Sequence, residues 1–311
     1  GTDRAIALKT DCNGRYVYLD PREGARIAVA EAARNVACAG ARPMAITNNL
    51  NFGNPKKPEV YFQLREAVAG MKEACEALGT PVTGGNVSLY NENPTGAVYP
   101  TPVIGMVGLV DSLAHITRSS FSTPGDAIVL LGDNTDEIGG SEYLVRVHDV
   151  VGGRPPRCDL AAERALTDAL LEAIRAGAVR SAHDCADGGL AVALAECVMM
   201  DRPHPTSATV DLSAWSALPQ RALLFGEAQG RVVVSTPDAA AVHAAAARNG
   251  VRATTIGEVT AASRPFSITI GAVKIQSSVV PLADAYHEAI PRIMSRAASA
   301  QDVALVSDSQ V

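Results

Sequence analysis

The sequence predicts an α+β fold in two domains, because short apolar runs that fit strands alternate with longer stretches whose apolar residues repeat at helical spacing. Residues 111–122 are polar and rich in Ser and Thr, and the turn signal Pro124-Gly125-Asp126 follows them. A chain of 311 residues is long enough for about two domains. We therefore predict domains over 1–123 and 124–296, and a disordered tail over 297–311, where periodicity is weak.

Regular elements are expected along both domains. In the first domain we expect strands at Ala5–Leu8, Tyr16–Leu19, Met44–Asn49, Val82–Leu89 and Val103–Val110, and helices at Arg22–Cys38 and Glu59–Leu78. In the second we expect strands at Ala127–Leu131, Val179–His183, Ala208–Leu212, Arg231–Ser235, Thr254–Val259 and Phe266–Ile275, and helices at Leu160–Ala176, Leu190–Met200, Asp238–Arg248 and Leu282–Ser295. This order predicts mixed sheets.

Composition argues against two classes of partner. The formal net charge is −6, Lys and Arg form no run, and aromatic residues are 4% of the chain, so neither a phosphate backbone nor stacked bases would find a suitable surface. No apolar run approaches the roughly 20 residues of a membrane span, and no apolar signal segment begins the chain. We expect a cytoplasmic protein that binds no nucleic acid and no membrane. Its six cysteines form no CxxC pair and are expected to be reduced and buried.

The most informative segment runs from Thr83 to Ser88 and reads Thr-Gly-Gly-Asn-Val-Ser. Its two glycines let a ligand approach the backbone, and exposed N–H groups in such a segment can bind phosphate oxygens. Asn86 offers a neutral oxygen to a hard cation, and Ser88 falls on the same strand face because strand side chains alternate. The alternative is structural, since Gly-Gly between apolar runs is also typical of a bulge or turn.

Two further segments leave a choice between ligand binding and turn formation. Residues 47–55 crowd four asparagines into the carboxyl end of an expected strand, where ligands bind in α/β sheets, but Asn is also common in turns. Residues 11–15 contain Asn13-Gly14 between two expected strands, which predicts a hairpin. Asp20, in front of Pro21, could instead cap a helix.

Two segments of the second domain have similar alternatives. Residues 181–190 place Asp184 and Asp187 before an expected helix, where they could hold Mg²⁺ for a nucleotide, or Asp187 could cap the helix. His183 with Cys185 permits a nucleophile hypothesis, but no third group that would orient the pair is evident. The polar residues 225–231 are expected to form a solvated turn before a strand.

These five segments, in this order, resemble the second half of the small form of phosphoribosylformylglycinamidine synthase. The most specific strings are Asn51-Phe52-Gly53-Asn54-Pro55 and the run from Gly84 to Glu92, and the resemblance covers residues 1 to about 295. It implies the two-domain fold of the aminoimidazole ribonucleotide synthetase type, in which the N-terminal domain completes a barrel with a partner half. Selenophosphate synthetase, thiamin-monophosphate kinase and the hydrogenase maturation factor share that fold.

The resemblance implies an ATP-dependent ligase reaction of purine biosynthesis. Formylglycinamide ribonucleotide, ammonia and ATP become formylglycinamidine ribonucleotide, ADP and phosphate, because ATP phosphorylates the amide oxygen and ammonia displaces the phosphate. The implied cofactors are Mg²⁺ and ATP. The implied partners are the N-terminal half of the same synthase, a glutaminase subunit that supplies ammonia, and a small bridging subunit.

Four site residues follow from matching the motifs, none of them catalytic, because the family's catalytic histidines belong to the N-terminal half. Asn48 and Gly85 would contact ATP, Asn86 would ligate Mg²⁺, and Ser88 would contact the substrate. Family members have an ATP-contacting aspartate at the position of Asn48, so this chain lacks a charge there. Segments 181–190 and 225–231 match counterparts of catalytic-half elements, and would line an auxiliary nucleotide site or be structural.

The chain is therefore expected to be the nucleotide-contributing half of a ligase, inactive alone. One alternative is a complete homodimeric synthetase or kinase of the same superfamily. Another is a non-catalytic scaffold half with a structural nucleotide. Because a sheet that completes a barrel needs a partner, the isolated chain is expected to form a homodimer.

Overall fold

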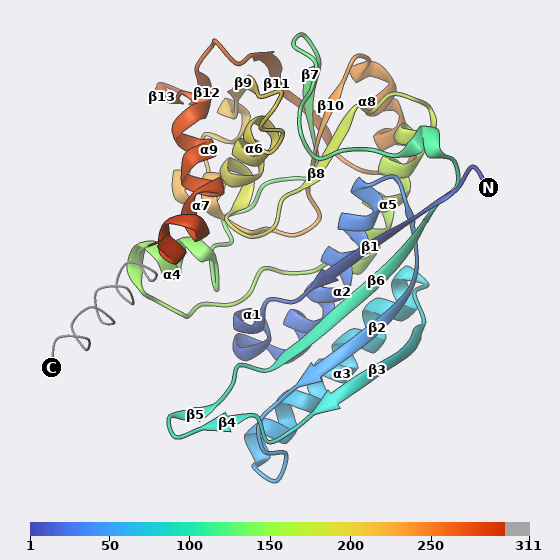
Figure 1. Cartoon of the computed structure of the whole chain (residues 1–311), viewed down its shortest axis with the longest axis vertical. Helices are drawn as coiled ribbons and strands as arrows, with labels where there is room; N and C mark the ends of the chain where they lie inside the picture. Colours follow the sequence, from blue (N-terminus) through green and yellow to red (C-terminus); the bar gives the residue numbers. More distant parts are fainter. Residues whose placement is uncertain (296–311) are drawn as a thin grey trace, which may run out of the picture.

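The computed structural model describes residues 1–295, so the predicted tail over 297–311 lies outside the described residues. A four-stranded sheet has the order β1-β6-β2-β3, and a seven-stranded sheet has the order β13-β12-β9-β11-β7-β10-β8 (Figure 1). The four strands are β1 (Ala5–Asp11), β2 (Arg42–Asn51), β3 (Val82–Ser88) and β6 (Thr101–Val110). The seven are β7 (Ala127–Leu131), β8 (Ser181–Asp184), β9 (Thr206–Asp211), β10 (Val232–Thr236), β11 (Ala253–Ala261), β12 (Phe266–Ile270) and β13 (Val273–Ser277), and a small hairpin joins β4 (Glu92–Asn93) to β5 (Gly96–Ala97).

The helices pack on one face of the first sheet and on both faces of the second (Figure 1). They are α1 (Gly14–Leu19), α2 (Pro21–Cys38), α3 (Pro58–Leu78), α4 (Glu142–His148), α5 (Leu160–Arg175), α6 (Gly189–Met199), α7 (Gln220–Phe225), α8 (Ala239–Arg248) and α9 (Val279–His287). None of the helices in residues 1–295 combines the length and the apolar character that crossing a membrane requires.

Helix α2 lies at the centre of the molecule, between the first sheet, α3 and α5. Most of its residues are buried, and many of them are alanines. Small side chains allow helices and sheet to approach α2 closely on several sides, which explains why this helix lacks the usual polar face. The C-terminal end of α2, with Ala37 and Cys38, reaches the hydrophobic core of the second sheet.

Within residues 1–295, helices cover only one face of the first sheet. Along β6, alternate residues such as Ile104 and Met106 are buried against α2 and α3. On the opposite face, Ile6 and Leu8 of β1 are 69% and 78% exposed. We call this uncovered side the open face. A large exposed apolar surface of this kind is typical of a surface that binds a partner.

The central strands of the second sheet are buried on both faces. Ile128 and Leu130 of β7 join the core formed with α6 and α7, whereas Val129 and Leu131 join the core formed with α5 and α8. A strand that is buried on both faces has no polar positions. This explains the continuous apolar run that predicted the strand.

Several predicted elements are wrong in kind or extent. Tyr16–Leu19 is helical rather than extended, because the Asn13 side chain accepts hydrogen bonds from the N–H groups of Arg15 and Tyr16 and caps α1; the predicted hairpin at Asn13-Gly14 is therefore absent. Phe266–Ile275 is a hairpin of two strands that turns at Gly271, where φ is +57°. The C-terminal helix begins at Val279 rather than Leu282, and residues 289–295 are also helical.

Short helices were harder to predict than long ones. Helices α1, α4 and α7 have six or seven residues, too few to show a helical repeat in the sequence. The alternative that Asp20 caps a helix is confirmed, since its carboxylate accepts from the N–H groups of Arg22 and Glu23 at the start of α2. Five of the six cysteines are buried and all six are free thiols, as predicted.

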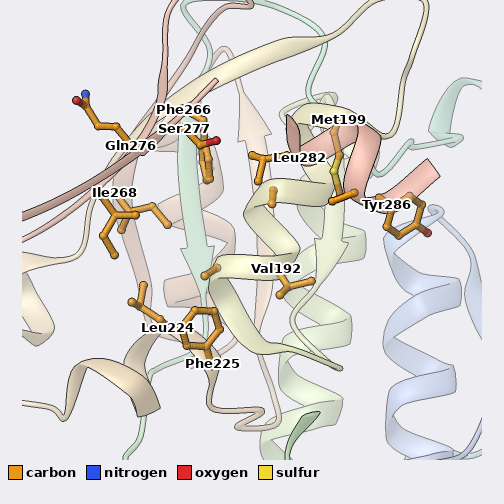
Figure 2. A pocket seen from close by; sticks show the side chains of 14 residues that line it. Val192, Met199, Leu224, Phe225, Phe266, Ile268, Gln276, Ser277, Leu282 and Tyr286 are labelled. Atoms are coloured by element: carbon orange, nitrogen blue, oxygen red, sulfur yellow. The ribbon is translucent and has the colours of Figure 1, made fainter. Parts of the chain in front are cut away.

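An apolar pocket of about 440 Å³ opens between α6, α7, the β12–β13 hairpin and α9 (Figure 2). Its walls are mainly aliphatic and aromatic, with Val192, Leu224, Phe225 and Ile268 among them, and Figure 2 shows the Gln276 amide pointing away from it. Among residues 1–295, no charged side chain lines this pocket. It therefore lacks the groups that bind phosphate or a metal ion, and the polar candidate site lies elsewhere.

Candidate functional site

The two asparagine-rich segments lie side by side in the first sheet. Strands β2 and β3 are parallel, and their register places Asn48 beside Gly85, Asn49 beside Asn86, and Asn51 beside Ser88. The shared carboxyl end of parallel strands is a common place for a ligand. All four residues predicted to bind ATP, Mg²⁺ or substrate thus belong to one pair of strands.

The four predicted residues do not share one face of the sheet. Asn86 and Ser88 are two residues apart and face the same way, as expected from strand geometry. Asn48 instead alternates with the buried residues Ile46 and Leu50 on the side covered by helices. The open face therefore carries Asn86 and Ser88. Asn48 lies on the side of the sheet that the helices cover, and Gly85 is its partner on β3.

The two glycines of β3 differ in whether packing requires a residue without a side chain. A Cβ atom on Gly85 would lie 2.2 Å from Asn48 Oδ1, so only glycine allows the Asn48 amide to cross this strand. A Cβ atom on Gly84 would meet no atom within 4 Å. Thr83 is the unpaired residue where the β2–β3 register shifts, so the bulge considered for Gly-Gly lies one residue earlier. Packing among the described residues gives no reason for glycine at position 84.

The side chain of Asn86 is only partly used by the protein. Its Nδ2 donates to Asn49 Oδ1 at 3.1 Å, and Oδ1 accepts no hydrogen bond from residues 1–295. A free amide oxygen beside an exposed strand fits Mg²⁺ bound to a nucleotide, because this ion takes few protein ligands and completes its shell with phosphate and water. Nowhere in residues 1–295 do three or more His, Cys, Asp or Glu side chains gather closely enough to hold a metal ion.

Ser88 begins a turn that is closed by Asn91. The Ser88 hydroxyl donates to Asn91 Oδ1 at 3.2 Å, and Asn91 Nδ2 donates to the carbonyls of Ser88 and Phe52. Glu92, just beyond this turn, accepts from the Asn54 N–H and pairs with Lys57. These two interactions lower the pKa of the Glu92 carboxyl, and the turn is held against the segment that follows β2.

A second polar cluster lies at the junction of the two sheets. Asn35 Nδ2 in α2 donates to Asp184 Oδ2 at 3.1 Å and to Asp11 Oδ2 at 3.4 Å. Burial raises the pKa of Asp11 to about 6, although Lys9 acts in the opposite direction. Burial also raises the pKa of Glu31 well above its usual range, and the charges of Asp11 and Asp184 add to this effect. We call Asp11, Glu31, Asn35 and Asp184 the junction cluster.

Sequence reasoning missed two members of the junction cluster. Glu31 and Asn35 were seen only as part of a helical pattern. A signal was present, because they are four residues apart and so share one face of a helix whose neighbouring positions are mostly alanine and valine. A buried polar pair in such a helix indicates that it faces other polar groups rather than a core.

Segment 225–231 is buried, and the predicted solvated turn is wrong. Glu227 and Arg231 are each 1% exposed. The Glu227 carboxylate accepts hydrogen bonds from the N–H groups of Glu142 and Gly188, both at 2.8 Å, and from the Tyr16 hydroxyl. Burial raises its pKa despite these donors. The segment therefore ties α1 to the loops before α4 and α6.

The nucleophile hypothesis for His183 and Cys185 does not survive. Cys185 is fully buried, and burial raises the pKa of its thiol to about 11, so the reactive thiolate is scarce at neutral pH. Asp187 does not cap α6, whose N-cap is Gly188; it accepts a hydrogen bond from Asn13 across the junction of the two sheets at 3.2 Å. Asn13 and Asp187 therefore link the two sheets through their side chains.

The chain combines two kinds of sheet. The first has helices on one face and amide side chains on the open face, and the second has helices on both faces. This combination defines a class of two-domain proteins. The model of "AIR synthase related protein, N-terminal domain" matches residues 1–110, and that of the C-terminal domain matches residues 123–269. The chain belongs to this family.

Two of the similar proteins with known names are subunits of one synthase. The chain is 48% identical over 298 residues to the phosphoribosylformylglycinamidine synthase subunit PurL of Moorella thermoacetica, covering 95% of this chain and 40% of the relative. It is 49% identical over 298 residues to PurL of Chlorobium luteolum, covering 93% and 39%. The chain thus spans about two fifths of the length of these relatives.

Solved structures share the fold. T. maritima PurL complexed with FGAR matches with a TM-score of 0.77 at 23% identity, covering 90% of this chain and 46% of that one. The hydrogenase maturation protein HypE matches with a TM-score of 0.61 at 17% identity, covering 89% and 88%. The fold expected from the family resemblance is therefore confirmed, whereas closure of a barrel with a partner half stays a prediction.

Proposed function

We propose that this chain is the C-terminal half of an ATP-dependent phosphoribosylformylglycinamidine synthase, and that it is inactive without the N-terminal half. The full enzyme would convert formylglycinamide ribonucleotide, glutamine-derived ammonia and ATP to formylglycinamidine ribonucleotide, ADP and phosphate. The observation that carries the proposal is the alignment of Asn49 and Asn51 with Asn86 and Ser88 on the open face. The 48% identity to a PurL subunit of which the chain spans 40% supports it.

In this proposal each predicted residue has one task. Asn86 Oδ1 ligates a Mg²⁺ ion that neutralises charge on the transferring phosphoryl group. The backbone of Gly85 and the Asn48 amide contact ATP, and Ser88 contacts the substrate. Structures of T. maritima PurL with ATP and with FGAR are consistent with binding of both molecules by the family.

The open face is the proposed contact with the N-terminal half. Ile6 and Leu8 are exposed apolar residues of a sheet that no helix of residues 1–295 covers on this side, and barrel closure would bury them. When that half is absent, a second copy of the chain covers the same surface and forms a homodimer. A glutaminase subunit and a small bridging subunit complete the proposed assembly in the cytoplasm.

A scaffold half with a structural nucleotide is the second candidate. The neutral Asn48 favours it, because this amide lies on the helix-covered side of β2 and carries no charge with which to bind a metal–nucleotide complex. Such a half would stabilise its partner and leave turnover insensitive to Asn86 and Ser88.

The test is synthase activity with ATP, Mg²⁺ and ammonia, for this chain alone and mixed with the separately produced N-terminal half. We expect activity only in the mixture, and a loss of 100-fold or more with Asn86→Ala, about the effect of losing one electrostatic contact. Gln276→Ala removes an exposed amide far from the site and is the matched control. Activity of the chain alone would favour the homodimeric enzyme, and an active Asn86→Ala mixture would favour the scaffold.

A further inference from the structure

Tyr90 has a backbone conformation that side chains other than glycine rarely adopt. Its φ is +61°, and among the non-glycine residues from 1 to 295 only Asp149 also has a positive φ. Asp149 is the C-cap of α4, where left-handed geometry is common. Tyr90 lies instead in the turn that follows Ser88, at the end of β3.

Hydrogen bonds on both sides of Tyr90 hold this conformation. Its N–H donates to the Gly53 carbonyl at 3.0 Å, and the Asn91 N–H donates to the Phe52 carbonyl at 3.1 Å. The Asn91 side chain closes the same turn through the Ser88 and Phe52 carbonyls. The surrounding chain thus imposes a left-handed residue at position 90, and glycine would adopt that conformation with less strain.

Neither a hydrogen bond nor an aromatic contact of the Tyr90 side chain within residues 1–295 offsets this strain. The side chain is 57% exposed. Within residues 1–295 its hydroxyl makes no hydrogen bond, and its ring packs against no other aromatic ring. By contrast, the rings of Tyr18 and Tyr99 pack edge to face with centroids 5.1 Å apart. Strained residues whose side chains do not serve packing concentrate where a protein contacts a ligand.

We propose that Tyr90 is a further substrate-contacting residue, whose hydroxyl donates to an oxygen of the ribonucleotide that Ser88 contacts; this rests on the proposed function. Ser88 and Tyr90 belong to one hydrogen-bonded turn. Gly85 lies three residues before Ser88, or about 10 Å along the strand. The turn therefore serves the ribonucleotide end of the site rather than the ATP end.

The test compares Tyr90→Phe, Tyr90→Gly and Asp149→Gly in the mixture with the N-terminal half. Asp149→Gly relieves the same kind of strain away from the site and is the matched control. We expect both Tyr90 variants to raise KM for the ribonucleotide at least fivefold, with KM for ATP and kcat within twofold of the unaltered chain. We expect both glycine variants to keep or raise the Tm of the chain alone, and Asp149→Gly to leave KM unchanged.

Each other outcome contradicts the inference. An unchanged KM in both Tyr90 variants would mean that the strain serves only the turn, and a lower Tm with Tyr90→Gly would show a structural role. A KM that returns to normal when the N-terminal half is added in excess would mean that Tyr90 contacts that half. A mixture of unaltered chains with no activity would remove the proposed function along with this inference, whereas an active mixture with insensitive Tyr90 variants removes this inference alone.

Discussion

At the scale of single residues, the polar groups of this protein have two environments with opposite consequences. The amides of the open face, such as Asn86, keep exposed acceptors that a ligand can use. The carboxylates of the junction cluster are buried together, and burial makes the ionised forms of Asp11 and Glu31 unfavourable, so that their pKa values are raised. Mutations in the first group should change ligand binding, and mutations in the second should change the pH dependence of stability.

The two glycines of β3 allow a direct comparison. Gly85→Ala places a Cβ atom 2.2 Å from Asn48 Oδ1, and we expect it to lower stability by about 1–3 kcal/mol because the strand or the amide must move. Gly84→Ala meets no atom within 4 Å and should change stability by less than about 0.5 kcal/mol. Urea unfolding of both variants measures the difference. Equal losses would mean that the Asn48 amide can turn away at no cost.

Asp11→Asn should stabilise the protein at neutral pH. Because burial raises the Asp11 pKa from 3.8 to about 6, the folded protein binds this proton more tightly than the unfolded chain does. The resulting destabilisation is absent below about pH 3.8, increases up to pH 6 and is complete above it. We expect a gain of up to about 3 kcal/mol at pH 7.5 that disappears near pH 4.

Urea unfolding between pH 4 and pH 7.5 measures the effect of Asp11→Asn. Asp284→Asn, at an exposed carboxylate of α9, is the matched control. A gain that stays constant with pH would show that Asp11 is not the titrating group.

At the scale of elements, the residues at the N-termini of the helices indicate where the helices begin. Helices α2 and α5 each begin at an aspartate, Asp20 or Asp159, whose carboxylate accepts from two backbone N–H groups. Helix α3 begins at Lys57 with no side-chain cap, but has Pro58 at its first position. Long helices with such signals were predicted to within a few residues, whereas the short α1, whose cap is Asn13, was missed.

Removing one cap tests this. Asp20→Ala should destabilise the protein by about 1 kcal/mol, because two N–H groups at the start of α2 lose their acceptor. Asp20→Asn keeps an oxygen at the same place and should cost only a few tenths of that. Thermal unfolding of both variants is the measurement, and equal losses would mean that charge rather than the hydrogen bond matters.

At the scale of the whole molecule, the two sheets are joined through buried polar contacts around α2. Arg34 Nη1 of α2 pairs with Glu163 Oε1 of α5 at 2.5 Å, and both side chains are at most 2% exposed. The Glu163 charge, with other carboxylates nearby, raises the Arg34 pKa against the effect of burial. Arg34 Nη2 also donates to Gln229 Oε1 at 2.9 Å, so one guanidinium connects three segments.

Removing one partner of the Arg34–Glu163 ion pair should strongly lower the free energy of unfolding. Arg34→Ala leaves the Glu163 carboxylate buried without its partner, and we expect a loss of about 3–5 kcal/mol. The double variant Arg34→Met, Glu163→Leu removes both charges and should recover most of that loss. Denaturant unfolding of the single and double variants measures the coupling, and equal stability of the two would show that the pair contributes nothing specific.

The open face should control assembly. Leu8 is 78% exposed in the middle of β1, so Leu8→Lys places a charge in the proposed contact and should convert the homodimer of the isolated chain to a monomer. Leu113→Lys changes a leucine that is 49% exposed outside the sheet and should leave the dimer intact. Light scattering at micromolar concentration distinguishes the two. A monomer in the unaltered chain would contradict the dimer itself.

The sequence by itself determined the class of fold, the long helices and the strands of both sheets apart from the division between β12 and β13, because each carries its own periodicity, caps or apolar run. It also indicated that Asn86 and Ser88 share a face, since alternation along a strand is local geometry. The roles of Asn48, Gly85, Asn86 and Ser88 and the division near residue 123 stay predictions.

Only the tertiary structure decided which polar residues meet. The junction cluster draws on β1, α2 and β8, and the Glu227 carboxylate binds groups from α1 and two distant loops. The contacts from Glu227 to Tyr16 and Glu142 and from Asn35 to Asp184 join residues 211, 85 and 149 positions apart, so no local pattern reports them. The burial of Glu227 and Arg231 was missed for the same reason: a polar segment looks solvated until its partners from other elements are in place.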